Sequence, residues 1–457
     1  MNERFVPCRL LLTGAVSAAL GGSPAAAGPV YQDDPALRDY VARARRMNRE
    51  LAARSIEIAK RDSDRAAVRA GYLPKLDLDV RYTRTFGNEL DLGKLVNPAY
   101  EGLNQIVGDN RFPTDLHLVI PLRLDARLRL TQPLYAPAIT AGDHLAEAGI
   151  ASSVAERAVT ERDIGASVRS VYIQHARAGL VVDLLRRSRP LFVEALRVSR
   201  LLETNDMATG DAVPRAKAEL AAFDQRIRDV ERQERFAARQ LDLLVDTEID
   251  APVPVPPTLA VPPLPVATSS KLVANARAVR RELAVVSAGD AAHAAEREVV
   301  RARYLPSLGV AVDYGFLTND APGFDNDYVA VSIVASWNLF SGGADHARIR
   351  SAELERAALA VRRGQLEDRI ELEVLQAWTD ADDARQAIAS SEERIASAGV
   401  AYNIVAIEYA AGAVPQIDLI AARTTLLQAE TDRIVAVTDL WLHLVELDRV
   451  AETQEDR

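Results

Sequence analysis

The chain has 457 residues with 55 Lys or Arg and 65 Asp or Glu, which gives a formal net charge of −10 and a pI near 5.3. This acidic balance argues against nucleic-acid binding, which usually requires a basic surface. Only 5% of the residues are aromatic, while Ala, Arg, Glu and Leu dominate, so long helices are favoured over a large globular core.

Residues 1–27 are predicted to be a signal peptide. A basic start and an apolar stretch from Leu10 to Leu20 are followed by Ala25-Ala26-Ala27, which fits a signal-peptidase site. The mature chain is expected to begin near Gly28, outside the cytoplasm. Cys8, the only cysteine, precedes the apolar stretch, so neither disulfides, nor thiol catalysis, nor a lipid anchor is expected. No later run reaches about 18 apolar residues, so only strands are expected to cross a membrane.

The chain repeats one unusual junction. Helical spacing begins at Asp34-Pro35 and ends before Tyr72-Leu73-Pro74, where residues alternate between apolar and polar as in a strand. A second helical pattern ends at Tyr304-Leu305-Pro306 and again gives way to alternation. The spacing of 232 residues (304 − 72) recurs between Arg49-Glu50-Leu51-Ala52 and Arg281-Glu282-Leu283-Ala284 (281 − 49). The chain is therefore predicted to contain two copies of one structural unit.

A second alternating run follows in each copy. Every even position from Leu116 to Leu130 is apolar, and the second copy alternates from Val329 to Leu339. Each run is long enough for a tilted strand to cross a bilayer. The Gly, Asn and Pro-containing segment from Gly87 to Asp115 is predicted to be a long mobile loop between the first two strands, and residues 318–327 the shorter loop of the second copy.

Very long helices are predicted for residues 141–206 and 344–410. In the second, apolar or small residues recur at steps of four and three, which is a heptad seam. Both end in short turns, at 207–214 and 409–416, so each copy forms a helical hairpin, and a kink is predicted at Pro190 of the first.

Four segments result from this pattern. The signal peptide covers residues 1–27, the first structural repeat 28–250, an extended Pro-rich connector 251–268, and the second repeat 269–457.

This order of elements, with the twin Tyr-Leu-Pro junctions and the stretch "WNLFSGG" from Trp337 to Gly343, resembles the TolC-like outer-membrane efflux proteins. The resemblance implies a mixed α and β membrane protein: a homotrimeric channel with four strands per chain in a shared 12-stranded β-barrel and coiled-coil hairpins forming a periplasmic tunnel. It implies a location in the bacterial outer membrane, extending into the periplasm.

The function that the resemblance implies is a passive channel of a tripartite efflux or type I secretion system, gated at its periplasmic end. It would export small molecules or proteins. The implied partners are a periplasmic adaptor, an inner-membrane pump of the RND, ABC or MFS type, and outer-membrane lipid. No cofactor and no enzymatic activity are expected, because the sequence has no nucleophile elbow, phosphate loop or HExxH motif.

The resemblance assigns site residues by position. Tyr409 and Asp418 match the family's gate around Gly412, although Val414 and Ala421 replace a frequent Arg and a second Asp, so one acidic ring is implied. The hairpin turns, expected to bind the adaptor, and the polar strand face, expected to line the barrel lumen, comprise respectively Gly210, Pro214, Gly412 and Pro415, and Arg123, Asp125, Arg127 and Arg129.

Two alternatives stay open at this point. One is a secreted or periplasmic coiled-coil scaffold without a pore, in which the strands would be simple hairpins. The other is a heavy-metal export duct of the same family. The 6 histidines are scattered without ligand spacing, so no metal site is expected.

Overall fold

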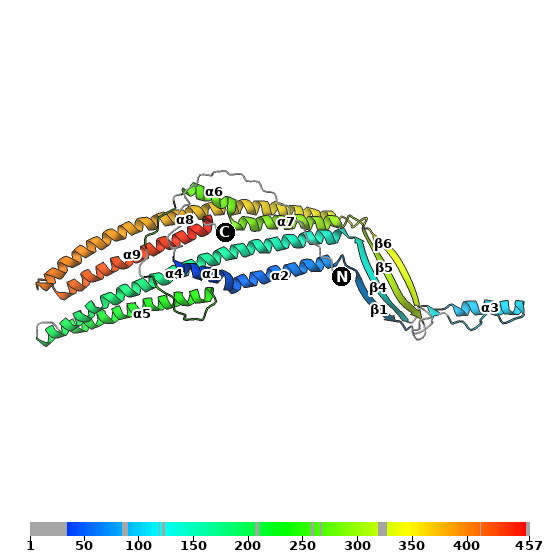
Figure 1. The fold of residues 1–457 in the computed structure, drawn as a ribbon, viewed down its shortest axis with the longest axis horizontal. Helices are drawn as coiled ribbons and strands as arrows, with labels where there is room; N and C mark the ends of the chain where they lie inside the picture. The colour runs from blue at the N-terminus through cyan, green and yellow to red at the C-terminus, as the bar shows by residue number, and fades with distance from the viewer. Residues whose placement is uncertain are drawn as a thin grey trace, which may run out of the picture.

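The structure, a computed structural model, describes residues 34–84, 90–117, 119–120, 124–205, 210–256, 260–265, 267–318, 327–411 and 413–453. The molecule is long and narrow: two helical hairpins form one end, and a sheet and a separate helix form the other (Figure 1). The predicted signal peptide, Arg123 and Gly412 lie outside the described residues.

Each repeat supplies two short helices, two long strands and a helical hairpin. The first consists of α1 (Pro35–Met47), α2 (Arg49–Ala70), β1 (Lys75–Tyr82), β4 (Leu124–Tyr135), α4 (Pro137–Thr204) and α5 (Ala212–Leu244). The second consists of α6 (Ser269–Val279), α7 (Arg281–Ala302), β5 (Ser307–Thr318), β6 (Asp327–Ser336), α8 (Ala344–Ala410) and α9 (Gln416–Ala451).

The first helical segment of each repeat is broken in two, which the sequence analysis did not predict. α2 starts after Asn48, whose side chain accepts hydrogen bonds from the amides of Glu50 and Leu51. α7 starts after Arg280, which occupies the same position of the repeat, 232 residues later (280 − 48). The break is therefore a shared feature of both copies.

The segment predicted as a loop between the first two long strands is structured instead. It contains β2 (Leu90–Asp91) and α3 (Gly93–Val107), with β3 (Val119–Ile120) pairing with β2. The Asn97 side chain exchanges two hydrogen bonds with the backbone of Leu116, and Asn104 does the same with Phe112. These asparagines tie the helix to the returning chain, so the loop prediction was wrong.

The four long strands form one antiparallel sheet in the order β1-β4-β5-β6. Successive side chains of a strand point to opposite faces, and opposite partners share a face. One face is apolar and open to its surroundings; its members include Leu76 (61% exposed), Leu78 (70%), Val331 (69%) and Ile333 (73%). The other face is polar, as the alternation predicted.

The helices pack along seams of small and apolar residues. On α8, the buried seam includes Ile370, Val374 and Ser391, each fully buried, as the heptad spacing predicts. α4 continues through Pro190, so the predicted kink does not break the helix. Among the described helices, none combines the length and the apolar character needed to cross a membrane.

Candidate functional site

The predicted gate residues lie at the tip of the second hairpin, at the end of the molecule opposite the sheet (Figure 1). Tyr409 is half-buried in the last turn of α8, and Asp418 is exposed in the first turn of α9. Pro415 is the N-cap residue of α9. In the described part of the chain, neither gate side chain has a side-chain partner, so both remain available to contacts outside this chain.

The tip of the first hairpin lies beside that of the second. Its predicted docking residues, Gly210 and Pro214, are exposed, and a Cβ built on Gly210 meets nothing within 4 Å. Near the tips, Ser199 on α4 hydrogen-bonds Gln416 on α9 at 3.2 Å. The structure thus brings both predicted turns to one end and connects them.

A cation missed by the sequence analysis joins the hairpins above their tips. Arg423 on α9 donates to the Ser188 hydroxyl on α4 at 2.9 Å, and its guanidinium lies 5.7 Å from the centre of the Tyr402 ring on α8. The half-buried Tyr402 belonged to the predicted seam, but no local signal distinguished Arg423 from the many other helix arginines.

The polar face of the sheet carries paired charges. Arg129 donates two hydrogen bonds to Asp313, at 2.6 and 3.1 Å, and lies opposite Asp77 in the strand register. Arg127 is 3.6 Å from its register partner Asp79. The three described residues of the predicted polar set, Asp125, Arg127 and Arg129, therefore share one face of one strand, where acids on both neighbouring strands accompany the arginines.

Gly315 permits this packing. A Cβ added to it would lie 2.6 Å from the Ala126 carbonyl oxygen and 2.8 Å from the Arg127 Cβ. Any larger side chain would displace the neighbouring strand, so this position sets how closely β4 and β5 approach.

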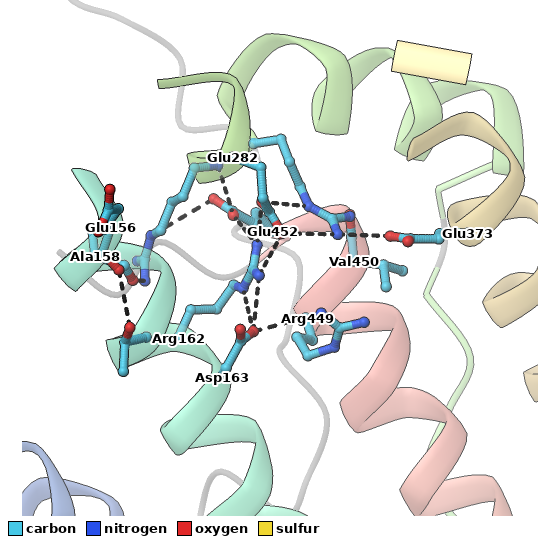
Figure 2. A network of polar contacts seen from close by, with 12 residues as sticks. Glu156, Ala158, Arg162, Asp163, Glu282, Glu373, Arg449, Val450 and Glu452 are labelled. Carbon is cyan, nitrogen blue, oxygen red and sulfur yellow. Dashed lines mark hydrogen bonds and ion pairs between the residues drawn. The ribbon is translucent and has the colours of Figure 1, made fainter. Parts of the chain in front are cut away.

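A second site, also missed, is a buried charge network near the middle of the molecule (Figure 2). Arg162 on α4 is 8% exposed and donates to Glu282 at 2.7 Å and Glu452 at 2.8 Å. Arg280, 3% exposed, donates to Glu282 at 2.9 Å and Glu373 at 2.8 Å. These residues come from α4, α7, α8 and the end of α9, so the network joins the two repeats.

Electrostatics hold Glu282 ionised within this network. Burial is the largest influence and opposes its charge, but hydrogen bonds from Arg162 and Arg280 outweigh burial and lower its pKa from 4.5 to about 2. Its carboxylate is therefore charged at neutral pH.

The same network fixes two helix ends. Arg280 donates to the Val450 carbonyl oxygen and Asn275 to that of Ala451, which satisfies carbonyls at the end of α9. In return, the Glu452 carboxylate accepts from the Arg281 amide at 3.0 Å, at the start of α7. Helix ends from one repeat are thus capped reciprocally.

One group of possible metal ligands occurs in the described residues. His293 Nδ1 lies 3.4 Å from carboxylate oxygens of Glu296 and Glu355, and all three side chains are at least one-third exposed. The helical i,i+3 pair on α7 meets Glu355 on α8, a contact that sequence spacing alone did not reveal. The three side chains satisfy one another as ion pairs.

The comparisons with known proteins agree with this architecture. The profile of the outer membrane efflux protein family matches residues 272–451. Among curated protein sequences, none matches the chain significantly.

Several solved structures share the fold over nearly the whole chain. The Campylobacter jejuni CmeC outer membrane channel is 14% identical with a TM-score of 0.73, covering 97% of this chain and 93% of its own. The Vibrio cholerae outer membrane protein VceC is 15% identical with a TM-score of 0.70, covering 92% and 97%. The Neisseria gonorrhoeae MtrE outer membrane channel is 16% identical with a TM-score of 0.68, covering 91% and 89%.

The repeated helix–strand–hairpin unit is thus the fold of TolC-like channels, and the location in the outer membrane with a periplasmic extension agrees with it. The match over residues 272–451 identifies the chain as a member of the outer membrane efflux protein family.

Proposed function

We propose that three copies of this chain form a passive export channel with a shared 12-stranded barrel. The observation that carries the proposal is the four-stranded sheet with one exposed apolar face and one charged face. Its outer strands, β1 and β6, have open edges, and unsatisfied backbone groups are not tolerated in lipid. Four strands are too few to close around a channel, whereas twelve leave a lumen.

The charged face would then line the water-filled interior. The Arg129–Asp313 and Arg127–Asp79 pairs place both signs of charge on this wall. Such a wall favours hydrated cargo without strong selection for one charge, as suits a duct whose selectivity resides in its pump. No step of this function requires bond chemistry, and the relatives with this fold are channels.

The hairpin tips supply the proposed periplasmic entrance. With threefold symmetry, Asp418 becomes a ring of three carboxylates and Tyr409 comes to face a neighbouring chain. The exposed turns around Gly210, Pro214 and Pro415 would be the docking points of an adaptor, which an inner-membrane pump of the RND, ABC or MFS type would complete. This arrangement serves tripartite efflux or type I secretion alike.

Extraction and conductance test the proposal together. We expect the protein in detergent extracts of outer membranes as a heat-modifiable trimer, and we expect that trimer to conduct ions in planar bilayers. A protein that dissolves without detergent and never conducts would favour the scaffold without a pore and would refute the channel.

A further inference from the structure

Four aromatic–leucine pairs occupy the four junctions between the long strands and the helices. Tyr72-Leu73 precedes β1 and Tyr304-Leu305 precedes β5, while Leu134-Tyr135 ends β4 and Leu339-Phe340 follows β6. All eight side chains are exposed, from 37% for Tyr72 to 84% for Phe340. We call these eight residues the junction collar. An apolar pair recurring at every junction points to a shared role.

The strand register places the four pairs at one end of the sheet. Lys75 is opposite Thr131, Tyr135 is opposite Leu308, and Ser307 is opposite Ser336. The junctions therefore meet at the border between sheet and helices (Figure 1). The collar continues the exposed apolar face of the sheet at its helical end.

Polar contacts hold the collar in place. The Trp337 indole donates to the Tyr304 carbonyl oxygen at 2.9 Å, and the Tyr72 hydroxyl bonds to Thr140. Beside Leu339-Phe340, Ser341 donates to Asp345 at 2.6 Å, and that carboxylate is only 2% exposed. The polar neighbours thus turn inward to a buried acid, which leaves Leu339 and Phe340 facing outward on a fixed support.

The composition of this border selects its partner. Tyr and Trp combine an apolar ring with a polar tip, which suits the boundary between acyl chains and head groups. Lys75 (74% exposed), Arg303 (48%) and Arg348 (51%) lie at the same border, where their charges can meet phosphates.

We infer that the junction collar and Trp337 bind the head-group region of the periplasmic phospholipid leaflet. The collar sets the depth at which the sheet sits in the membrane. This inference rests on the proposed channel function, because it requires the sheet to lie in a bilayer.

Fluorescence quenching by brominated lipid tests the contact. The full chain is reconstituted into phosphatidylcholine vesicles brominated either near the head groups or near the acyl-chain ends. Trp337 is 60% exposed, whereas Trp441 is buried and Trp378 half-buried in the helical part. The quenching that is lost in Trp337→Phe therefore reports the collar alone.

We expect the Trp337 contribution to be quenched about twofold or more by shallow bromines relative to deep ones. The double variant Leu339→Asp, Phe340→Asp should reduce this quenching, because charged groups avoid the apolar boundary. Val361→Asp, which alters an equally exposed side chain on α8, is the matched control and should leave the quenching unchanged.

The possible failures are distinguishable. If the protein enters vesicles and conducts but the Trp337 contribution is not quenched, the collar is covered by a neighbouring chain and the inference is overturned. If no version of the protein enters vesicles, the proposed channel function itself fails.

Discussion

The buried charge network makes the folded state sensitive to one carboxylate. Replacing Glu282 with Gln keeps the size of the side chain but removes its negative charge between Arg162 and Arg280, both of which are buried. Arg162 retains Asp163 and Glu452, and Arg280 retains Glu373. The substitution therefore weakens the network without emptying it.

The magnitude follows from the pKa of Glu282. The fall from 4.5 to about 2 corresponds to about 3 kcal/mol, since one pKa unit is worth 1.36 kcal/mol. A quarter of the side chain stays exposed, and solvent screening there lowers our expectation to about 2 kcal/mol of unfolding free energy at pH 7. Because the folded-state pKa is depressed, this stability is present above pH 4.5 and is lost as pH falls toward 2.

The assay is heat unfolding of the detergent-solubilised protein, followed by circular dichroism at pH 7 and pH 3. Glu282→Gln should unfold at a clearly lower temperature than the wild type at pH 7, and the gap should shrink to less than half at pH 3. Glu371→Gln is the matched control: it loses a 2.6 Å contact with Arg277, but both side chains are over 40% exposed, so we expect about 0–1 kcal/mol.

Two results would refute this reasoning. The first is a Glu282→Gln variant as stable as the wild type at pH 7. The second is a gap between the two proteins that is the same at pH 3 as at pH 7, because a loss caused by altered packing alone would not depend on the protonation of this group.

Further predictions concern the two ends of the molecule. Asp418→Asn should weaken the block of bilayer conductance by divalent cations from the periplasmic side; an unchanged block would place the gate elsewhere. Gly315→Ala should lower the heat stability of the trimer, because its Cβ would meet the Ala126 carbonyl oxygen, whereas Gly364→Ala, with nothing within 4 Å, should not. An epitope tag at Asp109, exposed just after α3, should bind antibody on intact cells; binding only after the outer membrane is opened would reverse the topology.

Periodic patterns made most of the fold predictable. The α8 seam at Ile370, Val374 and Ala377 is buried because a helix that packs along its whole length repeats its contacts every three or four residues. The sheet was equally accessible, since a strand with one apolar face must alternate. In both cases, the signal lies within the element itself.

The parts that could not be predicted depend on contacts between distant segments. Arg162 meets Glu282, 120 positions away, and Glu452, 290 positions away, and neither spacing leaves a local pattern. The α3 segment failed for a related reason. Its Gly, Asn and Pro content is typical of a loop, but Asn97 and Asn104 bond to backbone groups that return beside the helix.

The two repeats have diverged at the position where their first helical segment breaks. In the first, the neutral Asn48 side chain donates to the Leu244 carbonyl oxygen at the end of α5, at 2.9 Å. In the second, the charged Arg280 performs this task for Val450 at the end of α9, supported by Glu282. Only the second joint therefore depends on an ionised carboxylate.

This difference predicts where acid first loosens the protein. As pH falls from 4.5 toward 2, protonation of Glu282 removes a partner of Arg280, so the end of α9 should exchange its amide hydrogens sooner than the end of α5. Hydrogen exchange of the trimer at pH 3, compared with pH 7 after correction for intrinsic rates, measures both ends in one experiment. Glu282→Gln should already show the faster exchange of α9 at pH 7. Equal acceleration at the ends of both helices would mean that the joints are equivalent and that the charge at Arg280 does not control the second hairpin.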